Sequence, residues 1–376
     1  MRPTLPLSVL LSAFALAGFF VPGCGSSDAD PDGGATTALP DGAPLPTTDA
    51  STAPTVLEDG AIVPPPPPPP PLPTAGGGHF YYTVNEKTVL RIAAKQGAQP
   101  ENITAALNRL GKGGGSRDRY PSASIDGAWM LLDADGRFGC QGDCLIRVPR
   151  DVSGGELVKP GGEEISPEGL SAIVASGDLI VFPSTGGPHR VDLYATRLQG
   201  STWSAKQLLT AASPYAYNNV AALTFDGQRV TFDCGSSPYP EGGNNFACEV
   251  SVTGTGFRKI VGPDALPSPR QTYVQNPREG LDGLLFEMAW PVGGNSPEIV
   301  WLLPKGGGAP TPIAKNFNNT VAPCPLPDGR FGILWLDSPN NSPGRHELTV
   351  AQRDGSSGIV LTPGVDVTDN GVGCSD

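Results

Sequence analysis

The segment that most constrains the fold is NNVAALTFDGQRVTF, at residues 218–232. It predicts a short strand, an Asp-Gly turn and a second strand. An Asp-Gly pair between apolar runs is typical of a β-hairpin, because both turn residues can adopt positive φ. Related turns recur about every fifty residues, at Asp126-Gly127, Ser176-Gly177-Asp178, Asp226-Gly227, Asp282-Gly283 and Asp328-Gly329. This recurrence predicts one structural unit that is repeated along the chain.

Each turn is followed by three segments with strand patterning. We expect second strands at residues 128–132, 179–182, 229–232, 284–288 and 331–335. Third strands are expected at 145–148, 190–196, 247–252, 298–303 and 347–351. Weaker fourth strands are expected at 156–158, 206–209, 258–261, 311–314 and 358–361. Four short strands per repeat at this period predict the blade of a β-propeller.

The two ends of this region complete a further blade. Residues 79–84, 88–93 and a strand near Ile103 supply its second, third and fourth strands, and residues 372–376 supply its first. This pairing of the N- and C-terminal strands would remove exposed sheet edges. We therefore predict an all-β fold over residues 79–376, a six-bladed β-propeller of four-stranded antiparallel blades. A short helix is expected between blades from Pro100 to Leu110, with Pro at its start and Gly111 at its end.

Three of the turns resemble the PD40 (WD40-like) repeats of TolB-like six-bladed propellers. They are Pro121-Ser-Ala-Ser-Ile-Asp126-Gly127, Thr224-Phe-Asp226-Gly227 and Pro325-Leu-Pro-Asp328-Gly329. The signature of that family is a Pro, an aromatic residue, Ser-Pro-Asp-Gly and an apolar strand. The turns of this chain lack the tryptophan of that signature and most of its Ser-Pro pairs. The resemblance covers about residues 79–376 and implies a module that binds a protein partner.

Residues 1–23 are predicted to form a lipoprotein signal peptide. Arg2 precedes an apolar run over residues 5–21, which is typical of a secretion signal. Gly23-Cys24 resembles the lipobox of bacterial lipoproteins and implies lipidation of Cys24, although Pro22 is an uncommon occupant of its position. The alternative is an ordinary secretory signal with an incidental cysteine. Gly25, directly after the cysteine, favours the outer membrane by resemblance to lipoprotein sorting in enteric bacteria. We therefore expect a lipid-anchored protein of the cell envelope, on the periplasmic or surface side.

Residues 24–78 are predicted to form a disordered, acidic, proline-rich tether. From residue 25 onward they contain acids but no Lys or Arg, and they show no apolar period from which a core could form. Eight consecutive prolines at 64–71 predict a stiff polyproline II segment. A spacer that lifts the propeller off the membrane is the simpler interpretation, and a ligand for a proline-binding domain is the alternative.

Charge and cysteine content narrow the function classes. The formal net charge of −12 argues against a nucleic-acid-binding surface. Besides Cys24 there are six cysteines, an even number for an exported chain. Their places in the blade pattern predict three disulfides: Cys140–Cys144, Cys234–Cys248 and Cys324–Cys374. Metal binding at Cys140 and Cys144 is the alternative for that pair, but no second Cys/His pair has zinc spacing.

The sequence contains no motif of a known catalytic site. His79, His189 and His346 fall in different blades, and no nucleophile elbow, HExxH motif or phosphate loop is present. Asp133-Ala-Asp135-Gly136 resembles the opening of a calcium loop, but it lacks the later Glu. We therefore predict no catalytic residue, no metal site and no cofactor. Catalysis by His189, which lies near Asp192, is the alternative.

The loops that join fourth to first strands, and second to third strands, gather on one face of a propeller. Aromatic and arginine side chains on exposed loops favour partner binding. The alternative is that they pack between blades. We expect a monomeric protein that binds, or serves as a scaffold for, an envelope protein or polymer. One alternative is a propeller hydrolase or lyase acting on polysaccharide or peptide. Another is a structural protein without a ligand. The candidate residues of this face are Arg119, Tyr120, Tyr215, Tyr217, Asn219, Tyr239, Trp290, Asn319 and Arg345.

Overall fold

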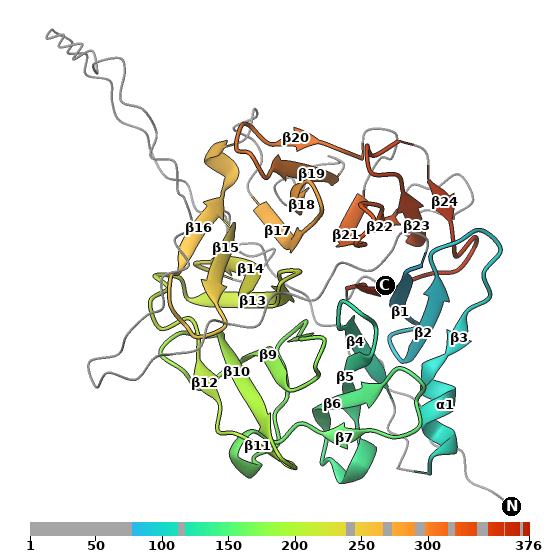
Figure 1. Cartoon of the computed structure of the whole chain (residues 1–376), viewed down its shortest axis with the longest axis vertical. Helices are drawn as coiled ribbons and strands as arrows, with labels where there is room; N and C mark the ends of the chain where they lie inside the picture. Colours follow the sequence, from blue (N-terminus) through green and yellow to red (C-terminus); the bar gives the residue numbers. More distant parts are fainter. Residues whose placement is uncertain are drawn as a thin grey trace, which may run out of the picture. The chain divides into compact units, whose positions relative to one another are not determined.

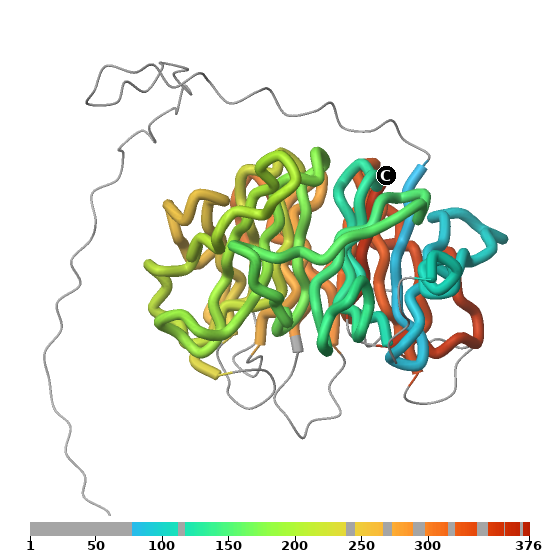
Figure 2. The backbone as a smooth tube through the Cα atoms, turned by 90° about the horizontal axis from the view of Figure 1, so that it is seen from below, coloured from blue at the N-terminus to red at the C-terminus, as the bar shows by residue number. Residues whose placement is uncertain are grey.

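The strands form a ring of blades. The computed structural model describes residues 77–111, 117–237, 245–265, 273–289, 298–314, 320–336, 345–356, 358–368 and 371–376. Nearly all of their regular structure is strand, divided among six antiparallel sheets. Figure 1 shows these sheets arranged around a common centre, and Figure 2 shows the same blades standing side by side. The predicted six-bladed β-propeller is confirmed.

We number the blades along the chain and give the strands of each from its innermost strand outward. Blade 1 contains β25 (Gly373–Ser375), β1 (His79–Val84), β2 (Thr88–Ala93) and β3 (Glu101–Asn102). Blade 2 contains β4 (Asp118–Ala123), β5 (Trp129–Asp135), β6 (Asp143–Pro149) and β7 (Glu156–Leu157). Blade 3 contains β8 (Ala172–Ile173), β9 (Leu179–Ser184) and β10 (Asp192–Gln199), and β10 pairs with both β11 (Thr202–Trp203) and β12 (Gln207–Leu208).

The remaining three blades have four strands each. Blade 4 contains β13 (Tyr217–Leu223), β14 (Arg229–Gly235), β15 (Phe246–Ser251) and β16 (Arg258–Val261). Blade 5 contains β17 (Tyr273–Glu279), β18 (Gly283–Ala289), β19 (Ile299–Pro304) and β20 (Thr311–Pro312). Blade 6 contains β21 (Thr320–Pro325), β22 (Phe331–Trp335), β23 (Glu347–Ala351) and β24 (Ile359–Val360).

Blade 1 joins the two ends of the described chain, as predicted. Strand β25 pairs with β1 in antiparallel register, His79 with Ser375, Phe80 with Cys374 and Tyr81 with Gly373. Figure 1 shows the C-terminus beside β1. Because β25 is the innermost strand of this blade, its pairing closes the ring and covers the inner edge of β1.

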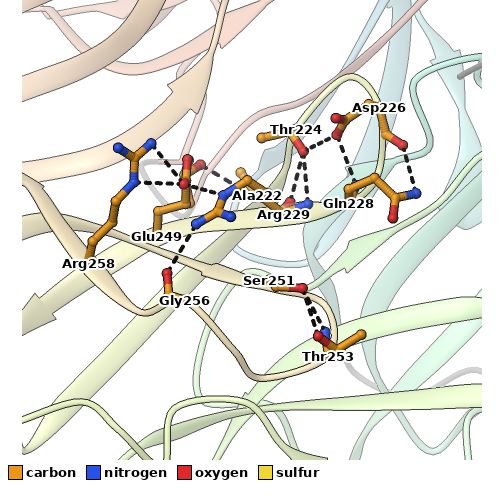
Figure 3. A network of polar contacts seen from close by, with 11 residues as sticks. Ala222, Thr224, Asp226, Gln228, Arg229, Glu249, Ser251, Thr253, Gly256 and Arg258 are labelled. Atoms are coloured by element: carbon orange, nitrogen blue, oxygen red, sulfur yellow. Dashed lines mark hydrogen bonds and ion pairs between the residues drawn. The ribbon is translucent and has the colours of Figure 1, made fainter. Parts of the chain in front are cut away.

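The hairpin turns are built differently from the prediction. Gly127, Gly177, Gly227 and Gly329 have positive φ, but the aspartates beside them do not. In blade 4, Asp226 Oδ1 instead accepts hydrogen bonds from Thr224 Oγ1 at 2.6 Å and from the Gln228 backbone N–H at 2.9 Å (Figure 3). Asp126 does the same in blade 2, with Ser124 and Ala128. The aspartate therefore caps the turn, and only the glycine adopts the left-handed conformation.

The hydrophobic core is divided among the junctions between blades. Met130 and Leu132 of β5 lie in one apolar cluster with Tyr81 and Ile103. Leu131, between them in sequence, lies in another cluster with Ile173, Phe182 and other apolar side chains of blade 3. Successive residues of a strand point to opposite faces of the sheet. The second strands are apolar along their length because each of their faces is covered by another part of the ring.

The short helices lie in connections between strands. Helix α1 (Ile103–Arg109) begins after Asn102, whose side-chain Oδ1 accepts a hydrogen bond from the Ala105 backbone N–H. The helix predicted from Pro100 is therefore present but starts later, because Asn102 provides the N-cap. The described part of the chain also contains three 3₁₀ helices: η1 (Arg137–Gly139), η2 (Pro160–Gly162) and η3 (Pro263–Ala265).

Three disulfides connect the pairs of cysteines that the sequence predicts. Cys140–Cys144 closes the loop between β5 and β6, and Cys234–Cys248 links β14 to β15 within blade 4. Cys324–Cys374 joins the innermost strands of blades 6 and 1. This last bond fixes the closing strand β25 to its neighbour by a covalent link as well as by the strand pairing.

Candidate partner-binding face

One face of the ring is defined by the ends of its inner strands. The first strand of each blade begins where the second strand ends, as shown by the pairs Asp118 with Ala134 and Tyr217 with Gly235. We call this side the loop face, and the opposite side, which carries the hairpin turns, the turn face. The candidate residues that the structure describes, except Arg345, lie in or just before the first strands of blades 2 and 4.

The innermost strands of blades 2, 4, 5 and 6 share a β-bulge. Each contains one non-glycine residue in the left-handed conformation: Tyr120 (φ 50°), Val220 (φ 54°), Asn276 (φ 50°) and Ala322 (φ 52°). The pairing with the second strand changes register at the same residues. Left-handed backbone is uncommon for non-glycine residues and costs roughly 1–3 kcal/mol, so it persists only where neighbouring contacts hold it.

Acidic side chains of the preceding blade hold two of these bulges. The backbone N–H of Asn276 donates to Asp233 Oδ1 of blade 4 at 2.8 Å. The backbone N–H of Ala322 donates to Glu287 Oε2 of blade 5 at 3.1 Å. Asp233 and Glu287 occupy the same position of their second strands, opposite Asn219 and Gln275. The carboxylates therefore connect neighbouring blades near the centre of the ring.

Asp133 occupies this position in blade 2 but has a different environment. Its Oδ2 accepts a hydrogen bond from Arg119 Nε at 2.8 Å, while its Oδ1 is buried without a hydrogen-bond partner. The described residues around β8, in the next blade, contain no left-handed residue equivalent to Asn276. Burial raises the pKa of Asp133 to about 6, although Arg119 acts in the opposite direction. Asp133 therefore titrates at a higher pH than an ordinary aspartate.

A network of ion pairs surrounds Asp133 at the loop face. Arg119 Nη2 lies 3.0 Å from Asp143 Oδ2, and Arg117 Nε donates to Asp143 Oδ1 at 3.2 Å. The guanidinium of Arg119 also lies 5.0 Å from the centre of the Tyr120 ring. The Arg119 side chain is 23% exposed, so part of it remains accessible to a partner. The network holds Arg119 and Tyr120 in fixed positions at the loop face.

A second, buried ion pair anchors the same blade. Arg137 and Asp118 are 2% and 1% exposed, and their side chains form two hydrogen bonds of 2.6 and 2.7 Å. Arg137 also donates to Asn108 Oδ1, and Thr104 donates to Asp118, so helix α1 belongs to the same network. A charge pair of this kind is retained in an interior only when further hydrogen bonds satisfy both groups.

At blades 3 and 4, one arginine–tyrosine pair lies on the loop face. Arg190 Nη1 donates to the Tyr217 hydroxyl at 2.8 Å, and its guanidinium lies 5.9 Å from the Tyr217 ring centre. Tyr215 instead packs against Phe246 and Phe257 in the apolar cluster between blades. Asn219 hydrogen-bonds to the backbone of Val220 and Glu168. The contacts of Tyr215 and Asn219 are therefore structural.

The candidate residues thus separate by environment. Arg119 and Tyr120 of blade 2 and Tyr217 of blade 4 lie on the loop face, each group with its own supporting residues. Arg345 is exposed and has a side-chain interaction of its own. Tyr239, Trp290 and Asn319 lie outside the described residues.

The three histidines do not come together. His189 Nδ1 lies 2.7 Å from Asp192 Oδ1, and the Thr210 hydroxyl donates to the same oxygen. The Asp192 carboxylate also accepts the backbone N–H of His189, which fixes the loop between β9 and β10. His79, in blade 1, is half-buried, and burial together with the nearby Arg150 lowers its pKa. Among the described residues, no serine or cysteine hydrogen-bonds to His189, so the group resembles a loop anchor more than a triad.

Cys140, Cys144 and Glu164 form a cluster of metal-ligand type within the described residues. Thiolates are the form of cysteine that binds metals, but these two sulfur atoms are joined to each other in a disulfide. Glu164 is instead paired with Lys159, which lowers its pKa. With the disulfide formed, this cluster offers only one carboxylate.

Sequence reasoning did not identify the acids of the second strands or Arg278 of β17. A signal was available, because Asp133 and Glu287 each follow a run of apolar residues in a second strand. An acid in such a strand is unusual unless it is paired or hydrogen-bonded. Arg278 likewise lies in a strand whose other positions are mostly buried.

Comparison with known proteins identifies the fold. No family model matches the chain, and no curated protein sequence matches it. Among solved structures, TolB from Acinetobacter baumannii has a TM-score of 0.53 at 13% identity, over 80% of this chain and 67% of that chain. Kuenenia stuttgartiensis hydrazine synthase has a TM-score of 0.54 at 13% identity, over 79% of this chain and 46% of that chain. At these identities the likeness concerns the fold alone, and the described residues of this chain form a six-bladed β-propeller like that of TolB.

Proposed function

We propose that the chain is a lipid-anchored cell-envelope protein whose propeller binds a protein partner through its loop face. Residues 1–23 would serve as the signal peptide, Cys24 as the lipidated residue and residues 24–78 as the tether that presents the propeller. The outer membrane is the proposed location. An envelope polymer is the alternative ligand, and a structural protein without a ligand is the simplest alternative.

One observation carries the proposal. Two arginine–tyrosine pairs, Arg119 with Tyr120 and Arg190 with Tyr217, lie on the same face, and ion pairs or hydrogen bonds hold them there. Arginine and tyrosine are enriched at the energetic centres of protein interfaces. Rigid side chains of this kind lose little conformational entropy on binding.

The partner is tested by affinity capture from membranes with the Tyr217→Ala variant. Arg353→Ala is the matched control, because Arg353 is exposed and pairs with Asp282 beside a hairpin turn on the turn face. We expect the wild type and the control to enrich the same protein, and Tyr217→Ala to lose most of it. Equal recovery by all three proteins would contradict the proposed face, and enrichment of no protein would favour the structural alternative.

The anchor has a separate test. Replacement of Cys24 by Ser should abolish incorporation of a labelled fatty acid and move the protein from the membrane to the soluble fraction. An unchanged membrane fraction in Cys24→Ser would contradict lipidation. A further alternative is a propeller hydrolase or lyase acting on polysaccharide or peptide. Stoichiometric zinc or calcium in the purified protein would favour it.

A further inference from the structure

One position of the innermost strands is occupied by small residues in every blade except one. In blades 2 to 6 it lies four residues before the turn motif, as Ser122 lies before Asp126 and Arg278 before Asp282. It pairs with the second strand, as Ser122 pairs with Leu131 and Arg278 with Leu285. The strands β13, β17 and β21 lie nearer the centre of the ring than the outer strands of the same blades (Figure 1). In ring order from blade 2 to blade 1, the residues at this position are Ser122, Ala172, Ala222, Arg278, Cys324 and Cys374.

The Arg278 side chain crosses from blade 5 to blade 6. Its Nη1 donates to Cys324 Sγ at 3.2 Å, and its Nε is buried without a hydrogen-bond partner. The sulfur belongs to the disulfide with Cys374 and is a weak acceptor. No carboxylate of the described residues forms an ion pair with Arg278. The structure therefore gives this guanidinium no strong acceptor.

Burial works against the charge of Arg278. Burial lowers the pKa of Arg278 to about 10, so the side chain remains protonated at neutral pH. The charged group that acts on it is Asp233 of blade 4, and burial raises the pKa of that carboxyl well above its usual range. Arg278 as a whole is half-buried, but its Nε–H is buried and has no acceptor that replaces its hydration, which is costly.

We propose that Arg278 is a binding site for a carboxylate group on the inner wall of the ring. The planar guanidinium matches the two oxygens of a carboxylate and binds them with parallel hydrogen bonds. The site carries a single positive charge, because the equivalent residues of the other five blades are uncharged. A phosphate dianion would bring a second negative charge that no residue at this position offsets. The site takes either a small carboxylic acid or the carboxylate terminus of a polypeptide.

The test follows the Nε–Hε resonance of Arg278 by NMR in the full chain with labelled arginine. The probes are propionate, a short peptide with a free C-terminal carboxylate, the same peptide as its amide, and inorganic phosphate. We expect a saturable shift with at least one carboxylate, and none with the amide. A shift with propionate identifies a small-acid site, and a shift with the peptide acid alone identifies a site for a polypeptide terminus.

Variants provide the second measurement. Carboxylate affinity should fall at least tenfold in Arg278→Met and should be unchanged in Arg197→Met, which removes an exposed arginine of β10. Arg278→Lys keeps the charge and should keep part of the affinity. If Arg278→Met does not fold, the resonance of the wild-type protein decides the question alone. No shift with either carboxylate, a larger shift with phosphate, or equal affinity in Arg278→Met would overturn the proposal. None of these outcomes depends on a partner at the loop face.

Discussion

The burial of Asp133 disfavours its negative charge, and this has a measurable consequence for stability. Its pKa is about 6 in the folded chain against 3.8 for an ordinary aspartate. Between these values the folded state binds a proton that the unfolded state has released, so stability falls as the pH rises from about 4 to about 6. At about 1.36 kcal/mol per pH unit, the loss is about 3 kcal/mol. Urea unfolding of the wild type and Asp133→Asn at several pH values measures it as the difference between the two proteins.

The control is Asp151, an aspartate whose pKa shifts in the opposite direction. Asp151 has a lowered pKa, because the Ser153 hydroxyl and backbone N–H donate to its carboxylate. The stability that Asp151 contributes is therefore lost as the pH falls below about 4. Between pH 4 and pH 6, the free energy of unfolding of Asp151→Asn should run parallel to that of the wild type. A pH profile of Asp133→Asn that is parallel to that of the wild type would refute the assignment.

Residue types alone did not separate binding residues from packing residues. Tyr215 and Tyr217 are two positions apart and share a chemistry, yet Tyr215 packs against Phe246 while Tyr217 contacts Arg190 at the loop face. The difference depends on neighbours from other blades, which the local sequence does not contain. The acids of the second strands were detectable in principle, because Glu287 interrupts the apolar run of β18.

Among the elements, the hairpin turn of blade 3 depends on the absence of a side chain at Gly177. Its φ is +74°, and an added Cβ would lie 2.4 Å from Trp129 Nε1 of blade 2. The Trp129 ring is held under the Arg147 guanidinium, with 4.3 Å between the guanidinium carbon and the ring centre. Gly177→Ala should therefore lower the free energy of unfolding by about 3 kcal/mol, from left-handed strain and overpacking together. Urea unfolding measures the change.

Gly186→Ala separates the two causes. Gly186 also has positive φ, at +92°, but an added Cβ there would meet no atom within 4 Å. It should cost only the backbone strain, about 1 kcal/mol. If the two variants are equally stable, the contact with Trp129 contributes nothing.

The hairpins show which part of an element a sequence motif can predict. All five turns were located correctly from their Asp and Gly residues, because the motif and the flanking apolar runs are local. Their conformation was predicted wrongly, because the aspartates act through their carboxylates. At Asp282-Gly283 the glycine has a φ of 154° and begins strand β18, so this turn differs from the other four.

At the scale of the whole molecule, the disulfides should contribute unequally. Cys324 and Cys374 are 50 residues apart in sequence, and Cys140 and Cys144 are 4 apart. In the chain-entropy model, stabilisation grows with the loop that a disulfide closes, which gives about 4 kcal/mol for the first bond and about 2 kcal/mol for the second. Replacing each pair by serines and measuring the unfolding midpoint in urea tests this order. Equal midpoints in the two variants would contradict this order.

The ring itself was predictable because its signal is repeated. Five similar units fixed the strand count, and the incomplete units at residues 79–93 and 372–376 could only complete one another. The contacts between blades were not predictable. The bulges at Tyr120 and Asn276 and the charge of Arg278 result from side chains that meet only after the ring has formed.

The pairing of β25 with β1 also bears on how copies of this chain encounter one another while they fold. Until β25 arrives, β1 presents a free edge, and the two segments are separated by almost the whole described chain. A contact so distant in sequence forms slowly. At high concentration, the β25 of a second molecule can reach that edge first. Exchange of this single strand would yield intertwined dimers in which each ring is locally complete.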